Sequence, residues 1–160
     1  LFPEAIRQLA LGGAELLVRV SAYMDPWGTA VPMDWWTTVN RMRAMENMCC
    51  VVAANQAASL QHYPPFSWPG GSMIVDYDGR ILAQADPGPG EKVVVAPIDT
   101  ESLRRERERR IGHDLLAHLR PELYSYMSSS RLAPAGRQEI TVESLRQRIS
   151  EAKKTLKEGN

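Results

Sequence analysis

Apolar residues recur along the first part of this chain with two different periods, which predicts alternating helices and strands. Residues 3–11 carry apolar side chains at helical spacing after Pro3, and Gly12-Gly13 is suited to ending the helix. Residues 16–20 follow as a short apolar strand that only Arg19 interrupts. A helix, a glycine turn and an apolar strand in this order indicate an α/β fold.

The middle of the chain continues this alternation after a loop over residues 21–32. Asp34 is a suitable N-cap for a helix over residues 35–48, which contain no Gly or Pro. Residues 49–54 form a continuous run of small apolar side chains, as in a central strand covered on both faces. The pattern therefore predicts a second helix and a second strand.

Further elements follow a second loop over residues 55–69. Asp78-Gly79 is a strong signal for the turn of a β-hairpin. Asp99 or Thr100 is suited to capping a short helix of alternating charge. The predicted elements are two hairpin strands over 72–76 and 80–85, a strand over 92–98 and a helix over 100–110.

The balanced charge and the short apolar runs exclude two classes of partner. The 160 residues contain 19 Lys and Arg and 19 Asp and Glu, so no overall field attracts nucleic acid or an anionic membrane. No apolar run approaches the ~18 residues of a membrane span. Cys49 and Cys50 are adjacent, so neither has a distant disulfide partner, which favours a reducing, cytoplasmic compartment.

The two cysteines raise the question of a thiol nucleophile. Both lie inside the apolar run of residues 49–54, where burial raises the pKa of a thiol and limits its contact with water. We therefore predict that Cys49 and Cys50 are core residues. An enzyme that uses one of them as its nucleophile is the alternative.

Two glutamates have both a catalytic and a structural interpretation. Glu46 lies at helical spacing from Arg43, and such acid–base neighbours commonly form ion pairs, so the structural interpretation is favoured. Glu4 lies at a helix start, where a carboxylate interacts favourably with the helix dipole. We therefore predict that Glu46 fixes its helix through an arginine.

The remaining charged clusters predict no additional site. His113, Asp114 and His118 lack a zinc-binding spacing, so no metal is expected, and no motif indicates another cofactor. Residues 104–110 interleave arginine with glutamate, so a solvated helix face is favoured over a basic patch.

The order and spacing of several motifs over residues 1 to about 110 carry a family resemblance. The motifs are Phe2-Pro3-Glu4, Gly13-Ala14-Glu15, Ser21-Ala22, the Trp-x-x-x-x-Arg-x-Arg-Ala-x-Glu-Asn helix of residues 36–47, the strand of residues 49–56 and the Gly-x-Ser hairpin of residues 70–83. Together they resemble the nitrilase superfamily of carbon–nitrogen hydrolases. Val20 stands where that family usually has proline.

The resemblance implies an α/β fold, namely the C-terminal half of a four-layer α-β-β-α sandwich of the nitrilase type with a helical C-terminal extension. It also implies a Glu–Lys–Cys triad in which the cysteine attacks a carbonyl or nitrile carbon, the glutamate is the general base and the lysine stabilises developing charge. Setting Phe2 on the family's nucleophile motif puts that cysteine four residues before Leu1, with the other two further upstream. We therefore expect no catalytic residue in this chain.

The resemblance also divides the chain into segments. They are a partial carbon–nitrogen hydrolase domain over residues 1–110, a C-terminal extension with packing or oligomer contacts over 111–130, and a linker with a terminal amphipathic helix over 131–160. Residues 128–136 have linker composition. The helix predicted over residues 141–157 carries an apolar stripe of Val142, Leu145, Ile149, Ala152 and Leu156.

The candidate substrate-binding residues are Ser21, Ala22 and Tyr23. They follow a strand end, where α/β proteins commonly place ligand contacts, and the resemblance puts Ala22 and Tyr23 at the rim of the substrate pocket. Ordinary loop packing is the alternative for all three. Three tryptophans could line that pocket, namely Trp27, Trp35 and Trp36. Core positions are the favoured interpretation for them.

The expected function is that of a fragment of a hydrolase cleaving non-peptide C–N bonds in a small amide, carbamoyl compound or nitrile. The alternative is a non-catalytic split or degenerate subunit that binds a partner half. Both predict the same fold, and the sequence directly before Leu1 separates them. The expected partners are the small-molecule substrate and either further copies of the chain or a complementing N-terminal half.

Overall fold

A computed structural model describes residues 2–58 and 68–124, together with residues 143, 146, 147, 150, 151 and 154. The chain divides into two compact units, Leu1–His118 and Leu119–Asn160. In the second unit, Pro121–Leu123 form a 3₁₀ turn, and the described positions from 143 to 154 are helical. The linker predicted over 128–136 and the apolar stripe predicted at Val142, Leu145, Ile149, Ala152 and Leu156 lie outside the described residues.

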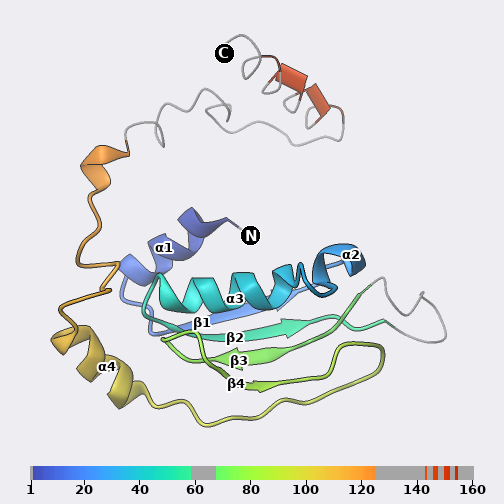
Figure 1. The fold of residues 1–160 in the computed structure, drawn as a ribbon, viewed down its shortest axis with the longest axis horizontal. Helices are drawn as coiled ribbons and strands as arrows, with labels where there is room; N and C mark the ends of the chain where they lie inside the picture. Colours follow the sequence, from blue (N-terminus) through green and yellow to red (C-terminus); the bar gives the residue numbers. More distant parts are fainter. Residues whose placement is uncertain are drawn as a thin grey trace. The chain divides into compact units, whose positions relative to one another are not determined.

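A four-stranded mixed sheet forms the centre of the first unit (Figure 1). Strands β1 and β2 are parallel, whereas β2 pairs with β3 and β3 with β4 in the antiparallel sense. The strands, in their order across the sheet, are β1 (Leu16–Ser21), β2 (Cys50–Asn55), β3 (Met73–Val75) and β4 (Ile81–Gln84). The predicted α/β fold is confirmed.

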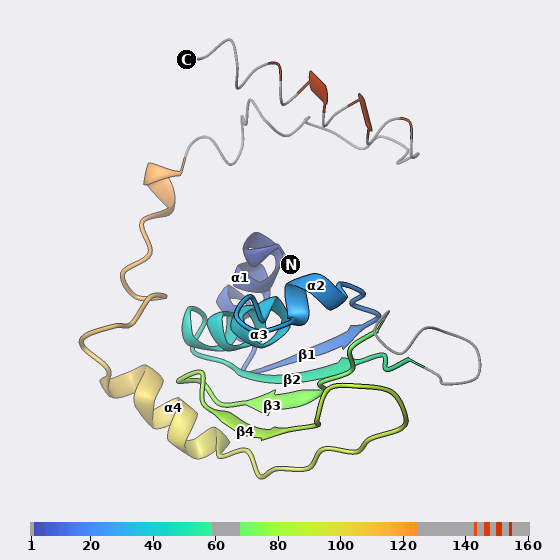
Figure 2. The same cartoon turned by 45° about the vertical axis from the view of Figure 1, so that its right-hand side comes forward.

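Helices cover one face of this sheet, and two views agree that α1 and α3 lie on the same side (Figures 1 and 2). Asp34 caps α3 as predicted, accepting a hydrogen bond from the backbone of Thr37. The helices are α1 (Pro3–Leu11), α2 (Pro26–Thr29), α3 (Trp35–Met45) and α4 (Thr100–Arg109). Among the described residues, no helix has the length and apolar character that a membrane crossing requires.

The core lies between the sheet and these helices. Alternate strand residues point into it, as the two-residue period of a strand requires. Its buried members are Leu17, Cys49, Val51, Ala53, Met73 and Val75 from the strands and their flanks, and Ala10, Trp36 and Ala44 from α1 and α3. Among the described residues, the strand side chains of this cluster all come from the helix-covered face of the sheet.

The opposite face of β1 is exposed. Val18 and Val20, which alternate with the buried Leu17, are 68% and 85% exposed. Strand β1 is also an edge strand of the sheet formed by the described residues. An apolar face and a free edge therefore meet along β1.

The β3–β4 hairpin turns at the predicted Asp78-Gly79 pair. The backbone of Gly79 has a φ of +76° and donates to the carbonyl of Asp76, so a residue without Cβ suits the position. The Asp76 side chain accepts hydrogen bonds from the backbones of Asp78 and Arg80 and closes the turn.

Two predictions about secondary structure are wrong. Residues 92–98 are not a strand, and Val93 and Val95 are 90% and 82% exposed. A strand needs a neighbouring strand for its backbone groups, and the described residues provide none at this position. The predicted loop over 21–32 contains the short helix α2, in which Asp25 accepts a hydrogen bond from the backbone of Gly28.

Cys49 and Cys50 are core residues, as predicted, with exposed fractions of 0% and 2%. Burial raises the pKa of both thiols. Arg107 of α4 donates to the Cys49 sulfur at 3.2 Å and opposes the rise in its pKa. The same guanidinium donates to the carbonyls of Ala14 and Met48, which joins α4 to the starts of β1 and β2.

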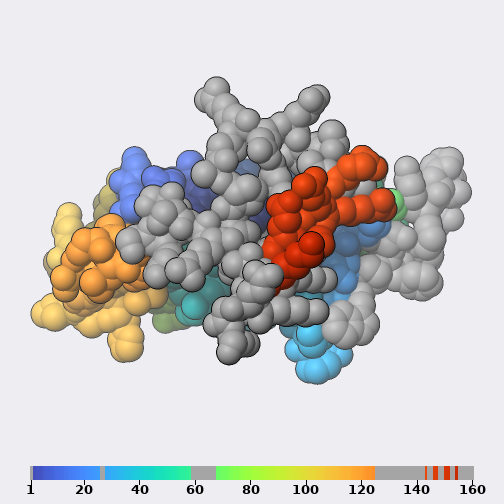
Figure 3. Space-filling view, turned by 90° about the horizontal axis from the view of Figure 1, so that it is seen from above, coloured from blue at the N-terminus to red at the C-terminus, as the bar shows by residue number. Residues whose placement is uncertain are grey.

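Figure 3 shows α4 at one end of this unit and the α2 region at the other.

Both thiols should therefore react slowly with a thiol probe in the folded chain and completely after denaturation. Burial restricts access to each sulfur, and the raised pKa reduces the thiolate fraction that reacts. Labelling that is quenched at successive times, with and without denaturant, and quantified by mass spectrometry measures this difference. Rapid native labelling of either cysteine would instead identify a functional thiol.

Candidate functional site

The carboxyl ends of the parallel strands β1 and β2 meet at one edge of the sheet. Ser21 ends β1 and is paired with Asn55, which ends β2. The backbone of Gln56 continues this pairing by donating to the Ser21 carbonyl at 2.9 Å. Parallel strands commonly bind ligands beyond their carboxyl ends, so this edge is the candidate site.

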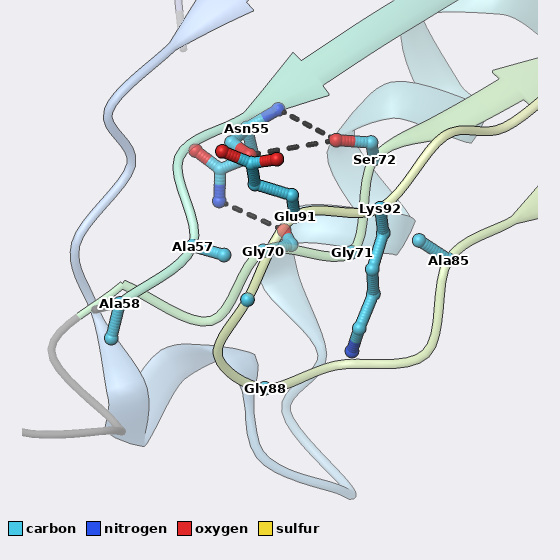
Figure 4. Close-up of a pocket in the computed structure, with 11 residues that line it drawn as sticks. Asn55, Ala57, Ala58, Gly70, Gly71, Ser72, Ala85, Gly88, Glu91 and Lys92 are labelled. Carbon is cyan, nitrogen blue, oxygen red and sulfur yellow. Dashed lines mark hydrogen bonds between the residues drawn. The ribbon is translucent and has the colours of Figure 1, made fainter. Parts of the chain in front are cut away.

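Asn55 connects three segments at this edge (Figure 4). Its side-chain oxygen accepts from the Tyr23 backbone at 2.8 Å, and its side-chain nitrogen donates to the Gly70 carbonyl at 2.9 Å. Its backbone N–H donates to the Ser72 hydroxyl at 3.1 Å. One side chain therefore fixes the segment after β1 against the segment that leads into β3.

A pocket of about 570 Å³ lies beside Asn55. Most of its walls are glycine and alanine, so little of the space is filled by side chains. Figure 4 shows the Glu91 carboxylate pointing toward Asn55 and Ser72, whereas the Lys92 ammonium points away from them. The lining residues are Asn55, Ala57, Ala58, Gly70, Gly71, Ser72, Ala85, Gly88, Gly90, Glu91 and Lys92. An amide, a hydroxyl and a carboxylate around an open space suit a small polar molecule.

Gly70 illustrates why the pocket wall requires small residues. Its φ is +67°, a conformation that favours glycine. A Cβ at this position would lie 3.2 Å from the Gly88 carbonyl oxygen and 3.3 Å from the Ala57 Cβ. The wall segments can approach each other this closely because Gly70 has no Cβ to separate them.

The structure places the predicted substrate-binding residues next to this pocket, outside the set that lines it. Ala22 is exposed, and Ser21 is half-buried. The Tyr23 ring stacks on Trp36 with 5.7 Å between ring centroids and packs against the core, while its backbone faces Asn55. Burial raises the pKa of Tyr23, and Asp25 adds to this effect. Substrate contact by Ser21, Ala22 and Tyr23 stays a prediction.

Trp36 connects the core with the pocket wall. Its indole N–H donates to the Gly71 carbonyl at 2.7 Å, and the residue is 3% exposed. The predicted core role is therefore confirmed for Trp36. Trp35 is 42% exposed, and the side chain of Trp27 lies outside the described residues.

Glu46 forms the predicted ion pair. Its carboxylate lies 2.6 Å from the Arg43 guanidinium, and both side chains are largely buried. Arg7 of α1 donates to the Glu46 carbonyl, whereas Arg41 donates to the carbonyl of Gly79. Glu46 follows the last residue of α3, close to the start of β2 and away from the pocket at its end.

The charged clusters of the sequence have structural partners. Among residues 2–58 and 68–124, no group of three His, Cys, Asp or Glu side chains is arranged to hold a metal ion. Asp114 accepts hydrogen bonds from the backbones of Leu116 and Ala117. Arg104 pairs with Glu15 and Arg110 with Asp78, so these α4 and post-α4 arginines join elements of the fold.

Asn55 was not predicted as a site residue. The sequence shows it only as the polar residue that follows the run of residues 49–54. Its position directly after that apolar run, at the end of a predicted strand, is the signal that could have identified it. Its bonding partners are separated from it by 15 to 32 positions, and the sequence does not specify such distant pairs.

Comparisons with known proteins agree with this architecture. The sequence model of the carbon–nitrogen hydrolase family matches residues 1–108. Deaminated glutathione amidase from Mus musculus is 36% identical over 123 residues, which cover 77% of this chain and 35% of that protein. A formamidase from Bradyrhizobium sp. is 33% identical over 112 residues, which cover 70% of this chain and 30% of that protein.

A solved structure shares the fold. The crystal structure of the C. elegans NitFhit protein has a TM-score of 0.62 and 36% sequence identity, and the match covers 78% of this chain and 27% of that chain. The chain thus spans about a third of the length of the curated amidases that it matches.

Replacement of Glu46 by alanine should lower the free energy of unfolding by about 1–3 kcal/mol, because it leaves a largely buried guanidinium without its carboxylate. Glu108→Ala, on the exposed face of α4, is the control and should change stability little. Chemical denaturation of the two variants measures the difference. A loss of turnover in the complete enzyme at unchanged stability would instead indicate a catalytic Glu46.

Proposed function

This chain belongs to the carbon–nitrogen hydrolase family, and we propose that it is the C-terminal part of an amidase-type enzyme of the nitrilase superfamily. The proposed reaction is hydrolysis of a non-peptide C–N bond in a small amide, carbamoyl compound or nitrile. The observation that carries the proposal is the 36% identity with an amidase over 123 residues. The substrate-sized pocket beside Asn55 supports it.

In the proposed enzyme, a cysteine upstream of Leu1 attacks the carbonyl or nitrile carbon of the substrate. A glutamate and a lysine further upstream act as general base and as stabiliser of the developing charge. The contribution of this chain is the wall of the substrate pocket. Asn55 holds that wall, and Ser21, Ala22 and Tyr23 form its rim.

The exposed side of the sheet supports a four-layer sandwich. Helices α1 and α3 cover one face, while Val18 and Val20 of β1 are exposed on the other. A second sheet on this face, with its own helices outside, completes the α-β-β-α order. We propose that the N-terminal half supplies this sheet and that residues 111–160 form an extension with oligomer contacts.

The second candidate function is a non-catalytic subunit that binds a partner half. The extent of the match supports this candidate, because the chain spans only about a third of the length of the amidases that it matches. The codons that precede Leu1 in its reading frame discriminate the two functions. An in-frame cysteine four residues upstream supports the enzyme, and a start codon at that point supports the subunit.

The isolated chain should release no ammonia from formamide, propionamide or an N-carbamoyl amino acid. The chain extended by its upstream reading frame should do so, since loss of a catalytic nucleophile costs several orders of magnitude in rate. Replacing the upstream cysteine by alanine should abolish the activity, whereas Cys49→Ser should not. Ammonia release by the isolated chain that disappears in Cys49→Ser or Cys50→Ser would contradict the proposal.

The isolated chain should also self-associate through the exposed sheet face. Covering even ~400 Å² of apolar surface stabilises by about 10 kcal/mol at ~25 cal/mol per Å², comparable to the ~5–15 kcal/mol of a whole domain. The double replacement of Val18 and Val20 by threonine should reduce association in sedimentation experiments. The control is the double replacement of Val93 and Val95 by threonine, two exposed valines outside the strands. A monodisperse wild-type monomer with cooperative unfolding at micromolar concentration would refute this.

A further inference from the structure

Arg19 lies on the helix-covered side of β1, where several contacts hold its side chain. Its guanidinium donates to the side chain of the buried Asn40 at 2.9 Å. The same group lies 4.5 Å from the ring centroid of Trp36 and 5.9 Å from that of Tyr23. A hydrogen bond and two aromatic faces therefore fix a half-buried cation in the middle of an edge strand.

This cation has no carboxylate partner among the described residues. Burial lowers the pKa of Arg19; Tyr23 opposes this effect, and the like charge of Arg43 adds to it. Residues 59–67 contain no Asp or Glu. Arg43, Arg104 and Arg110 each pair with an acid, so Arg19 differs from them. A partly desolvated charge without a counter-ion is costly, which indicates that an anion approaches from elsewhere.

The free edge of β1 determines how such an anion reaches Arg19. Residue Ala53 of β2 is the neighbour of Arg19 on the paired side, and the other side of β1 is the sheet edge. A strand added at this edge places a side chain ~4.5–5.5 Å, between Cβ atoms, from that of Arg19. On the opposite face, the same strand meets the exposed Val18 and Val20.

We propose that the edge of β1 binds a β-strand that carries an Asp or Glu opposite Arg19 and apolar side chains on the exposed face. The proposal rests on the proposed function, because the N-terminal half of the complete enzyme is the source of this strand. Two copies of β1 paired together would bring like charges near each other, which disfavours that occupant. Arg19 lines neither the pocket beside Asn55 nor three further pockets of the first unit, which disfavours a small carboxylate.

Two synthetic ten-residue peptides test the proposal on the full chain. Both alternate valine with threonine, and they differ only in a central Asp or Asn on the threonine side. NMR titration follows the side-chain N–H signal of Arg19, which is assigned by its loss in Arg19→Gln. We expect the Asp peptide to bind about tenfold more tightly than the Asn peptide, a difference of ~1.4 kcal/mol.

Three variants of the chain identify the cause of this preference. It should disappear in Arg19→Gln and persist in Arg19→Lys, which keeps the charge. The matched control, Arg80→Gln, removes an exposed arginine from the hairpin turn and should leave the tenfold ratio unchanged. If Arg19→Gln does not fold, the comparison of the two peptides on the wild-type chain and on Arg19→Lys still decides the matter.

Several results would overturn the proposal. Equal binding of the two peptides, or binding of neither, would do so, as would an Asp preference that survives in Arg19→Gln. Saturation of the Arg19 signal by millimolar acetate, with displacement of the peptide, would indicate a small carboxylate instead. A dimer formed through β1 that the peptide does not disrupt would indicate a second copy of the chain. None of these measurements involves turnover. An inactive complete polypeptide with an intact Asp preference would therefore contradict only the proposed function.

Discussion

The parallel register of β1 with β2 is the constraint on which the rest of the described fold depends. It aligns consecutive residue pairs from Leu16–Cys50 to Ser21–Asn55. Parallel neighbours require a crossover connection, and the connection here contains α3, which covers the sheet. Because both strands run in the same direction, Ser21 and Asn55 end at one edge. The site at that edge is thus a direct consequence of the strand pairing.

The pocket wall and the core share structural elements. Trp36 packs in the core and donates to the Gly71 carbonyl, so the first turn of α3 holds the glycine segment in place. Asn55 ties the same segment to the end of β1. The open space beside Asn55 is therefore bounded by backbone fixed from two directions, which preserves its shape although its walls carry few side chains.

Local signals of the sequence predicted local structure. The cap at Asp34, the turn at Asp78-Gly79 and the Arg43–Glu46 pair each depend on residues within four positions, and all three were predicted. The apolar run of residues 49–54 predicted β2. The strand predicted over 92–98 failed because it has no neighbouring strand among the described residues, whereas α2 depends on local hydrogen bonds to Asp25 that the loop prediction missed. The contacts of Asn55 and the isolation of Arg19 also arise from tertiary structure.

The separation of paired residues along the chain has a consequence for how the molecule folds. Leu16 meets Cys50, 34 positions later, whereas Val75 meets Ile81 across a turn of a few residues. Closing the longer loop costs more conformational entropy before any contact compensates for it. The hairpin is therefore the natural nucleus, and the β1–β2 ladder forms late. During synthesis, β1 therefore leaves the ribosome before β2, with which it pairs in parallel, has been synthesised.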